Sequence, residues 1–221
     1  MSGPTRRDAR VPLACLAAFA VVFAIAAVSP RDRADWLLES GLTFLAVPLA
    51  ILTYRRFPFS DRAYVQMTMF LALHTIGSHY TYSEVPIGDW VKQAFDLTRN
   101  HYDRVVHASF GLLMYLPVLE VVSRATRGAP RLAAVLLALS CVVAVSTVYE
   151  LIEWGAAVVV DPQAGVAFVG TQGDVWDAQK DTALASLGGV VAAAFELAWP
   201  GIRPAADRGA VPATNLGASQ R

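Results

Sequence analysis

The chain has 221 residues, of which 55% are hydrophobic and 16% are charged, and its formal net charge is zero. Ordinary soluble domains carry about 25% charged residues, so this composition, with a mean hydropathy of +0.45, predicts a membrane protein. A neutral chain without a clustered basic face is not expected to bind nucleic acid. The two cysteines both lie inside apolar runs, which argues against a disulfide framework.

The first apolar segment covers residues 11–28 and follows three arginines, Arg6, Arg7 and Arg10. A cleaved signal peptide is the alternative interpretation. Such peptides have an apolar region of roughly 7–15 residues, and this segment is longer. We therefore expect an uncleaved first transmembrane span.

Five further segments approach the length of about 20 residues that a helix needs to cross the hydrocarbon core. They are 36–54, 63–82, 104–123, 132–154 and 181–199. The expected fold class is all-α, a polytopic membrane helical bundle with about six transmembrane helices. The expected organisation is a cytoplasmic arm at 1–10, a six-span transmembrane domain at 11–200, and a cytoplasmic, disordered tail at 201–221 that is rich in small and polar residues.

Lysine and arginine in the connections predict the orientation, because these residues accumulate on the cytoplasmic side. With the N-terminus inside, the cytoplasmic segments hold twelve of the 18 basic residues and the outer segments hold six. An even number of spans also returns the C-terminus to the starting side. We therefore expect a multi-pass protein of the bacterial inner (plasma) membrane with both termini in the cytoplasm.

Threading six helices alternately brings the unusual polar residues to the outer side. HYDRVVH (101–107) opens the fourth span, YELIEW (149–154) ends the fifth, GTQGDVWDAQKD (170–181) opens the sixth, and the third ends with His74 and His79. An ionisable group at mid-membrane costs roughly 2.5–3.5 kcal/mol, so such residues normally line a bundle interior or an aqueous cavity. The sequence therefore predicts an outward-facing polar site made by four helix ends.

Helical spacing places these groups on shared faces. Asp103 and His107 lie one turn apart, and so do Glu150 and Glu153. The aspartates at 174, 177 and 181 share a face if their segment is helical, and Gly188 lies on the same stripe.

The candidate roles follow from the residue types, since imidazole and carboxylate groups suit a divalent metal. The candidate metal ligands are His101, Asp103, His107, Glu150, Glu153 and Asp181. The candidate catalytic residues are Glu150, as proton acceptor or ligand, with Asp181 opposite it, and His107. The candidate ligand-binding or charge-balancing residues are Arg104, Lys180, Asp174 and Asp177, and the histidines at 74 and 79 are further contributors.

Each pattern also has a structural interpretation. Asp103 and His107 form an i,i+4 pair at the membrane interface, and the aspartates before the sixth span cap that helix and meet its positive end. Lys180 or Arg104 neutralises the glutamates. Two like charges near the C-terminal end of a helix oppose the helix dipole and each other, so Glu150 and Glu153 favour a functional interpretation.

The segments HYDRVVH, YELIEW and GTQGDVWDAQKD resemble, in this order, signature stretches of the YjdF-type bacterial inner-membrane proteins, a family of unknown function. The resemblance covers most of the chain and implies a multi-pass inner-membrane protein, but it assigns no catalytic residues. A weaker resemblance links Glu150, Asp181 and Gly188 to VanZ-like membrane proteins, which are associated with glycopeptide-antibiotic resistance. The chain departs from that pattern at Glu153, where glutamine is usual, and at Ala185, where asparagine is usual.

Three function classes remain open. The first is an inner-membrane protein whose polar site binds a lipid headgroup, an envelope partner or a metal, so that its partners are the bilayer and such a component. The second is a metal-assisted membrane enzyme acting on a lipid-linked or envelope substrate, although the chain has no HExxH motif. The third is a small ion-coupled transporter, against which stand the missing internal repeat and the lack of a matching inner polar cluster. The sequence does not identify a cofactor; a divalent metal of unspecified identity is the candidate.

Overall fold

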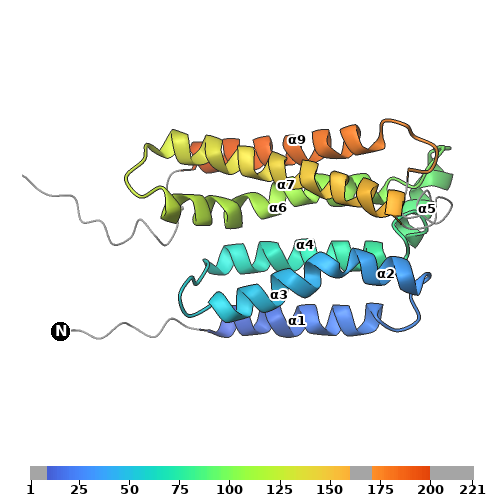
Figure 1. Ribbon diagram of the computed structural model, residues 1–221, viewed down its shortest axis with the longest axis horizontal. Coiled ribbons are helices and arrows are strands. Elements are labelled where there is room, and N and C mark those ends of the chain that lie inside the picture. The colour runs from blue at the N-terminus through green and yellow to red at the C-terminus, as the bar shows by residue number, and fades with distance from the viewer. Residues whose placement is uncertain (1–8, 160–170, 200–221) are drawn as a thin grey trace, which may run out of the picture.

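The computed structural model describes residues 9–159 and 171–199, and every element in these two ranges is a helix. The helices are α1 (Arg10–Ala26), α2 (Arg33–Glu39), α3 (Gly41–Thr53), α4 (Asp61–His79), α5 (Pro86–Ala94), α6 (Tyr102–Ala125), α7 (Arg131–Val159) and α9 (Asp177–Ala198). Except for α5, they run along one common axis (Figure 1). The all-α prediction is confirmed. Residues 1–8 of the expected arm and the whole expected tail, 201–221, lie outside the described residues.

Each of the six expected spans corresponds to one helix or to one pair of helices. Within the described ranges, α6, α7 and α9 are long and apolar enough to cross a membrane, and the α2–α3 pair makes a fourth candidate if it forms one span. This pair bends by 41° at its break. The apolar helix α1 has 17 residues, and α4 is less apolar because its 19 residues include Gln66, His74 and Ser78. The chain is a polytopic helical membrane bundle.

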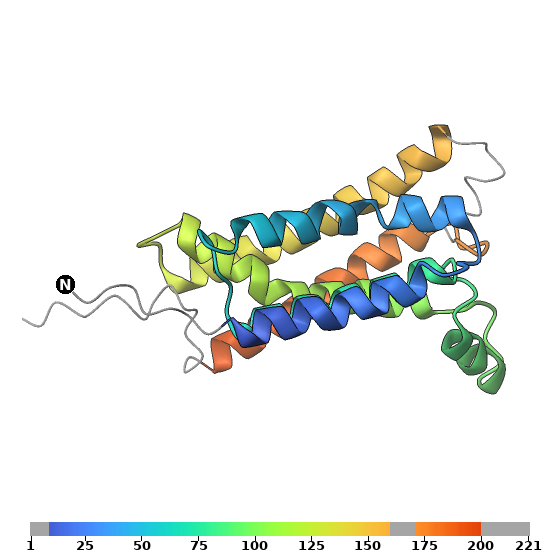
Figure 2. The same cartoon turned by 90° about the horizontal axis from the view of Figure 1, so that it is seen from below.

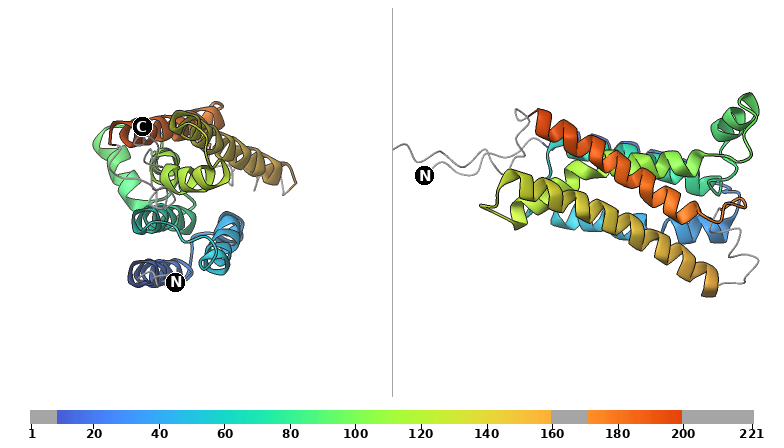
Figure 3. Two further views of the ribbon diagram at one scale, coloured as in Figure 1. Left: turned by 90° about the vertical axis from the view of Figure 1, so that its left-hand side faces the viewer. Right: turned by 90° about the horizontal axis from the view of Figure 1, so that it is seen from above.

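The centre of the bundle is α6, which packs against α4, α7 and α9, while α1 packs against the far side of α4 (Figure 3). Small residues bring α6 and α9 together. A Cβ atom on Gly111 would lie 1.8 Å from the backbone oxygen of Ala185, and one on Gly188 would lie 2.2 Å from that of Ala108. Glycine at such positions lets two backbones approach closely, and this contact brings the polar ends of α6 and α9 near each other.

A buried stripe along α7 ends at a glutamate. Its members recur every three or four residues, as one face of an amphipathic helix requires: Val135, Ala138, Val142, Ser146 and Glu150. The same face that packs the core therefore directs the Glu150 side chain into the bundle.

The short helix α5 was not expected from the sequence. Proline at its first position is favoured there, since that residue needs no intrahelical N–H bond. The helix lies beyond the end of the bundle (Figure 2) and exposes Ile87, Trp90 and Phe95, a pattern typical of a helix in the membrane interface. We call this end of the bundle the α5 end. The other end, where α3 leads to α4 and α6 to α7, is called the arginine end after Arg62, Arg124 and Arg131.

Candidate metal centre

Four ionisable residues from three helices meet inside the α5 end. Asp103 and His107 lie on α6, Glu150 on α7 and Asp181 on α9. The His107 Nε2 atom lies 3.5 Å from Asp103 Oδ1 and 3.4 Å from Glu150 Oε1. One ligand atom each from Asp103, His107 and Asp181 lie within 4.8 Å of one another. We call these four residues the carboxylate–histidine cluster.

The cluster is buried and has fewer hydrogen-bond donors than carboxylate oxygens within the described residues. Asp181 is 2% exposed, His107 8% and Glu150 9%. Within the described part of the chain, Asp181 Oδ1 and Glu150 Oε1 have no hydrogen-bond partner. A buried carboxylate without a paired cation or donor is costly. Three carboxyl groups share a single imidazole here, so the cluster has unused capacity to bind a cation.

The donor set suits a divalent transition metal, and two of its contacts have the spacing of such a site, while the ligand atoms of Asp103, His107 and Asp181, which lie within 4.8 Å of one another, would draw closer around an ion. In a tetrahedral zinc site with bonds of roughly 2.0–2.2 Å, neighbouring ligand atoms lie about 3.3–3.6 Å apart. The distances from His107 Nε2 to the oxygens of Asp103 and Glu150, 3.5 and 3.4 Å, fall in this range. One imidazole with carboxylates suits zinc, manganese or iron better than a purely oxygen-seeking ion.

A second polar group, which we call the arginine–aspartate layer, joins the segments before α6 and α9. Arg99 pairs with Asp177, and Arg104 pairs with Asp174 and lies 3.5 Å from Asp177. Lys180 Nζ donates to Asp174 Oδ2 at 2.6 Å. Hydrogen bonds from Lys180, from a backbone amide and from the Arg104 guanidinium hold the pKa of Asp174 at about 2. These two aspartates already have cationic partners, and the layer, with three cations to two carboxylates, has no unpaired acid.

The remaining sequence candidates lie outside the cluster. His101 accepts a hydrogen bond from Arg104 at 3.2 Å, and burial together with this guanidinium lowers the pKa of its imidazole. His79 Nδ1 lies 2.7 Å from the carbonyl oxygen of Ala26 and so holds the end of α1. Glu153 lies one turn beyond Glu150 and lines the cavity described below.

The sequence analysis missed a chain of hydrogen bonds beside the cluster. Tyr149 donates to Glu39 Oε2 at 2.7 Å, and His74 Nε2 lies 3.1 Å from the Glu39 carbonyl oxygen. Because a carbonyl only accepts, Nε2 carries the proton and His74 Nδ1 accepts from the Tyr82 hydroxyl at 2.5 Å. An acidic residue inside an apolar segment was the available signal for Glu39.

The sequence analysis also missed Asn100, which is fully buried at the α5 end. Its side-chain amide donates to Val85 O and to Asp89 Oδ1, both at 3.0 Å, and its Oδ1 accepts from the Tyr102 amide. Its backbone exchanges two hydrogen bonds with the Gln172 side chain, at 2.9 and 3.0 Å. Asn100 thus ties α5 and the segment before α9 to the start of α6.

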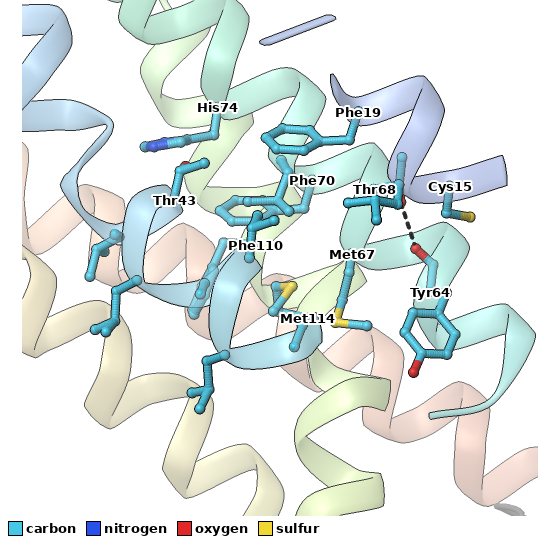
Figure 4. Close-up of a pocket in the computed structure, with 18 of the residues that line it drawn as sticks. Cys15, Phe19, Thr43, Tyr64, Met67, Thr68, Phe70, His74, Phe110 and Met114 are labelled. Atoms are coloured by element: carbon cyan, nitrogen blue, oxygen red, sulfur yellow. Dashed lines mark hydrogen bonds between the residues drawn. The ribbon is translucent and has the colours of Figure 1, made fainter. Parts of the chain in front are cut away.

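A cavity of about 780 Å³ adjoins the cluster between α1, α3, α4, α6 and α7. Asp103, His107 and Glu153 line it at the α5 end. Figure 4 shows Phe70 and Phe110 among the side chains farther along it. The cluster is therefore open to a molecule lying between the helices.

Comparison with known proteins places the chain in a family. Residues 11–201 match the family described as "Predicted membrane protein (DUF2238)", and the chain belongs to this family of membrane proteins. The chain is also similar to the inner membrane protein YjdF of Escherichia coli (strain K12), with 34% identity over 168 residues, which cover 76% of this chain and 80% of YjdF. The resemblance found in the sequence is confirmed. No solved structure matches the chain.

Proposed function

We propose that this membrane protein binds a divalent transition metal in the carboxylate–histidine cluster and presents it to a ligand in the adjoining cavity. The observation that supports this most strongly is the buried Asp181 carboxylate, which has an oxygen without a donor in the described chain and lies near His107 and Asp103. A metal would neutralise the surplus of carboxylates that the single imidazole leaves.

A metal bound at this position would act as a Lewis acid on an oxygen of the ligand. Glu150 is 3.4 Å from the His107 imidazole, so it either completes the ligand set or accepts a proton from a bound molecule. Asp103 Oδ1 lies 3.5 Å from the same His107 Nε2 atom and so orients the imidazole. The most economical assignment is therefore a metal-assisted reaction on a molecule that enters from the membrane.

We propose the orientation in which both termini are cytoplasmic and the cluster faces the outer side. Arg55, Arg56 and Arg127 belong to connections at the arginine end, opposite the cluster, and such residues favour the cytoplasm. Alkaline phosphatase fused after residue 97 should be active in a bacterial host, and green fluorescent protein fused after residue 128 should fluoresce. The reverse pattern would overturn the orientation.

Metal analysis of the purified protein tests the proposed centre. Protein prepared without chelators, loaded with Zn²⁺ and desalted should contain about one zinc per chain, as a single site requires. The variants Asp181→Asn and His107→Ala should lose it. Glu196→Gln removes an equally buried acid at the arginine end and should keep the zinc.

Two results would overturn the proposal. One is wild-type protein that retains no zinc, manganese or iron after loading. The other is zinc that remains stoichiometric in both cluster variants. In the second case the cluster would be an ion-paired structural unit, with a protonated His107 between Asp103 and Glu150.

A further inference from the structure

The cavity beside the cluster extends along the bundle for at least the depth of one leaflet of a bilayer, and its lining reaches Tyr54 and Tyr64 near the arginine end. Asp103 and Met114 both line it on α6, and eleven residues of helix span about 16 Å. The hydrocarbon core of a bilayer is about 30 Å thick. The cavity is therefore long enough along the bundle axis to hold one lipid chain. Its volume of about 780 Å³ lies in the upper part of the range for small-molecule sites, roughly 300–1,000 Å³.

The lining changes from polar to apolar along this axis. At the α5 end it includes Asp103, His107, Tyr149 and Glu153. Away from that end the side chains of Phe110 and Met114 on α6 and of Phe19 on α1 face the same space (Figure 4). A cavity with charged groups at one end and hydrocarbon along the rest is complementary to an amphiphile.

One wall of the cavity opens towards the bilayer. Leu45 and Leu49 of α3 line the cavity and yet are 66% and 55% exposed. Ala46 and Ala50 on the same helix leave room where larger side chains would fill the space. The wall formed by α3 is a helix distinct from α2, because the chain bends by 41° between the two helices. A molecule dissolved in the membrane can therefore reach the cavity without crossing water.

From this geometry we infer that the cavity holds the hydrocarbon chain of a membrane lipid, with an anionic oxygen head, phosphate or carboxylate, directed at the carboxylate–histidine cluster. The head-group part of this inference rests on the proposed metal, because a divalent ion draws oxygen ligands and offsets the cluster's negative charge. The chain part rests only on the shape and lining of the cavity. The substrate class assigned to the site is thus a lipid of the leaflet at the α5 end.

Photolabelling of the full-length protein in vesicles tests this inference. The probe is phosphatidylglycerol with a diazirine in the middle of one acyl chain, and the labelled residues are mapped by peptide mass spectrometry. Label should appear on Met67, Phe110 or Met114, which line the cavity. Ala46→Phe should reduce this label roughly tenfold, which corresponds to about 1.4 kcal/mol of binding.

The matched control is Leu52→Phe, on the same helix but 80% exposed and facing the bilayer; it should leave the cavity label unchanged. Met67→Trp provides a second cavity-filling variant on α4 if Ala46→Phe does not fold. Label confined to bilayer-facing residues such as Leu52 and Leu136, or unchanged by both cavity variants, would overturn the inference.

Competition identifies the head group. Excess unlabelled phosphatidylglycerol alone should displace the probe if the site selects phosphate, and palmitic acid should displace it equally if a carboxylate suffices. Equal displacement by hexadecanol, which has the chain but no anionic head, would overturn the head-group assignment.

The two proposals fail in different ways in these assays. Ala46→Phe should lose the label but retain its zinc. His107→Ala should lose its zinc and its discrimination against hexadecanol but retain the cavity label. Zinc binding without cavity label overturns only the lipid inference. Cavity label without zinc in the wild type overturns the metal and the head-group assignment that rests on it, but not the hydrocarbon-chain part of the inference.

Discussion

The buried carboxylates at the two ends of the bundle have different partners. At the arginine end, Glu120 is fully buried, accepts the Ser60 amide at 3.0 and 3.2 Å, and lies 3.2 Å from Arg124. Glu196 on α9 has an arginine as its partner, because its Oε1 lies 2.8 Å from Arg62, although this contact lacks hydrogen-bond geometry and Oε1 has no hydrogen bond within the described residues. At the α5 end, Asp103, Glu150 and Asp181 converge on one histidine.

This difference distinguishes acids that stabilise the fold through ion pairs from acids that can still bind a cation. A buried carboxylate that meets an arginine and a backbone amide is satisfied, so its role is explained by structure alone. A buried carboxylate without such partners raises the free energy of the fold unless a cation or proton joins it. The two ends should therefore respond differently when one group is removed.

The largest effect is expected at the arginine end. Arg124→Ala leaves the fully buried Glu120 without its guanidinium and also removes the stacking of Arg124 over Phe57, at 3.9 Å from the ring centre. Breaking a buried pair in this way costs roughly 3–5 kcal/mol. Denaturant unfolding in detergent measures the loss, and zinc content should not change. Adding Glu120→Gln to Arg124→Ala should restore part of the stability; a loss below about 1 kcal/mol in the single variant would contradict the comparison.

At the α5 end the same kind of change should have the opposite sign. Asp181→Asn removes a charge that lacks partners, so the metal-free variant should unfold at the same or a higher temperature than the metal-free wild type. Zinc at a hundred times its dissociation constant should stabilise the wild type by about 2.7 kcal/mol and leave the variant unaffected. Thermal unfolding with and without zinc measures both quantities. Destabilisation of the metal-free variant would show that Asp181 is a structural acid.

A smaller effect should follow from separating α6 and α9. Gly111→Ala puts a Cβ atom 1.8 Å from the Ala185 oxygen, and because that oxygen belongs to the backbone, the helices must move apart. Overpacking of this kind typically costs about 1–3 kcal/mol. The shift also moves Asp181 away from His107, so zinc affinity measured by calorimetry should fall.

Gly155→Ala is the control for the glycine experiment. Gly155 lies inside α7, and a Cβ atom there would have nothing within 4 Å. Alanine stabilises a helix interior over glycine by roughly 0.5–1 kcal/mol, so this variant should be at least as stable as the wild type. If Gly111→Ala behaved in the same way, close packing of α6 on α9 would not be required.

The fold was largely predictable because transmembrane helices are encoded by long apolar runs, which the sequence displays directly. The break at Ser40 was less visible, because α2 and α3 taken together are still apolar enough for one span. The helix α5 was missed because its nine residues form a short amphipathic segment in a polar connection. Such a segment has no span-length signal, and its position depends on Asn100, whose partners lie far along the chain.

The candidate site was only partly predictable. Spacing within one helix placed Asp103 with His107, but it cannot tell which acids meet an arginine from another segment. Asp177 and Asp181 lie four residues apart but differ in their partners, because Arg99 pairs with Asp177 and not with Asp181. Glu120 and Glu196 look as unusual in the sequence as Glu150 does. Tertiary pairing, which a single sequence does not display, separates these cases.

The smallest expected effect concerns the rim of the α5 end. Lys180 and Arg104 hold the pKa of Asp174 at about 2, below its ordinary value of 3.8. The ionised form therefore stabilises the fold fully above about pH 4, and this contribution is lost as the pH falls towards 2. Asp174→Asn should lower the unfolding temperature slightly at pH 7, and the difference from the wild type should shrink between pH 4 and pH 2. Asp96→Asn removes an exposed charge from the same end and controls for net charge. A difference that is constant with pH would show that the Asp174 ion pairs add no stability. Ion pairing would then not distinguish the arginine–aspartate layer from the carboxylate–histidine cluster.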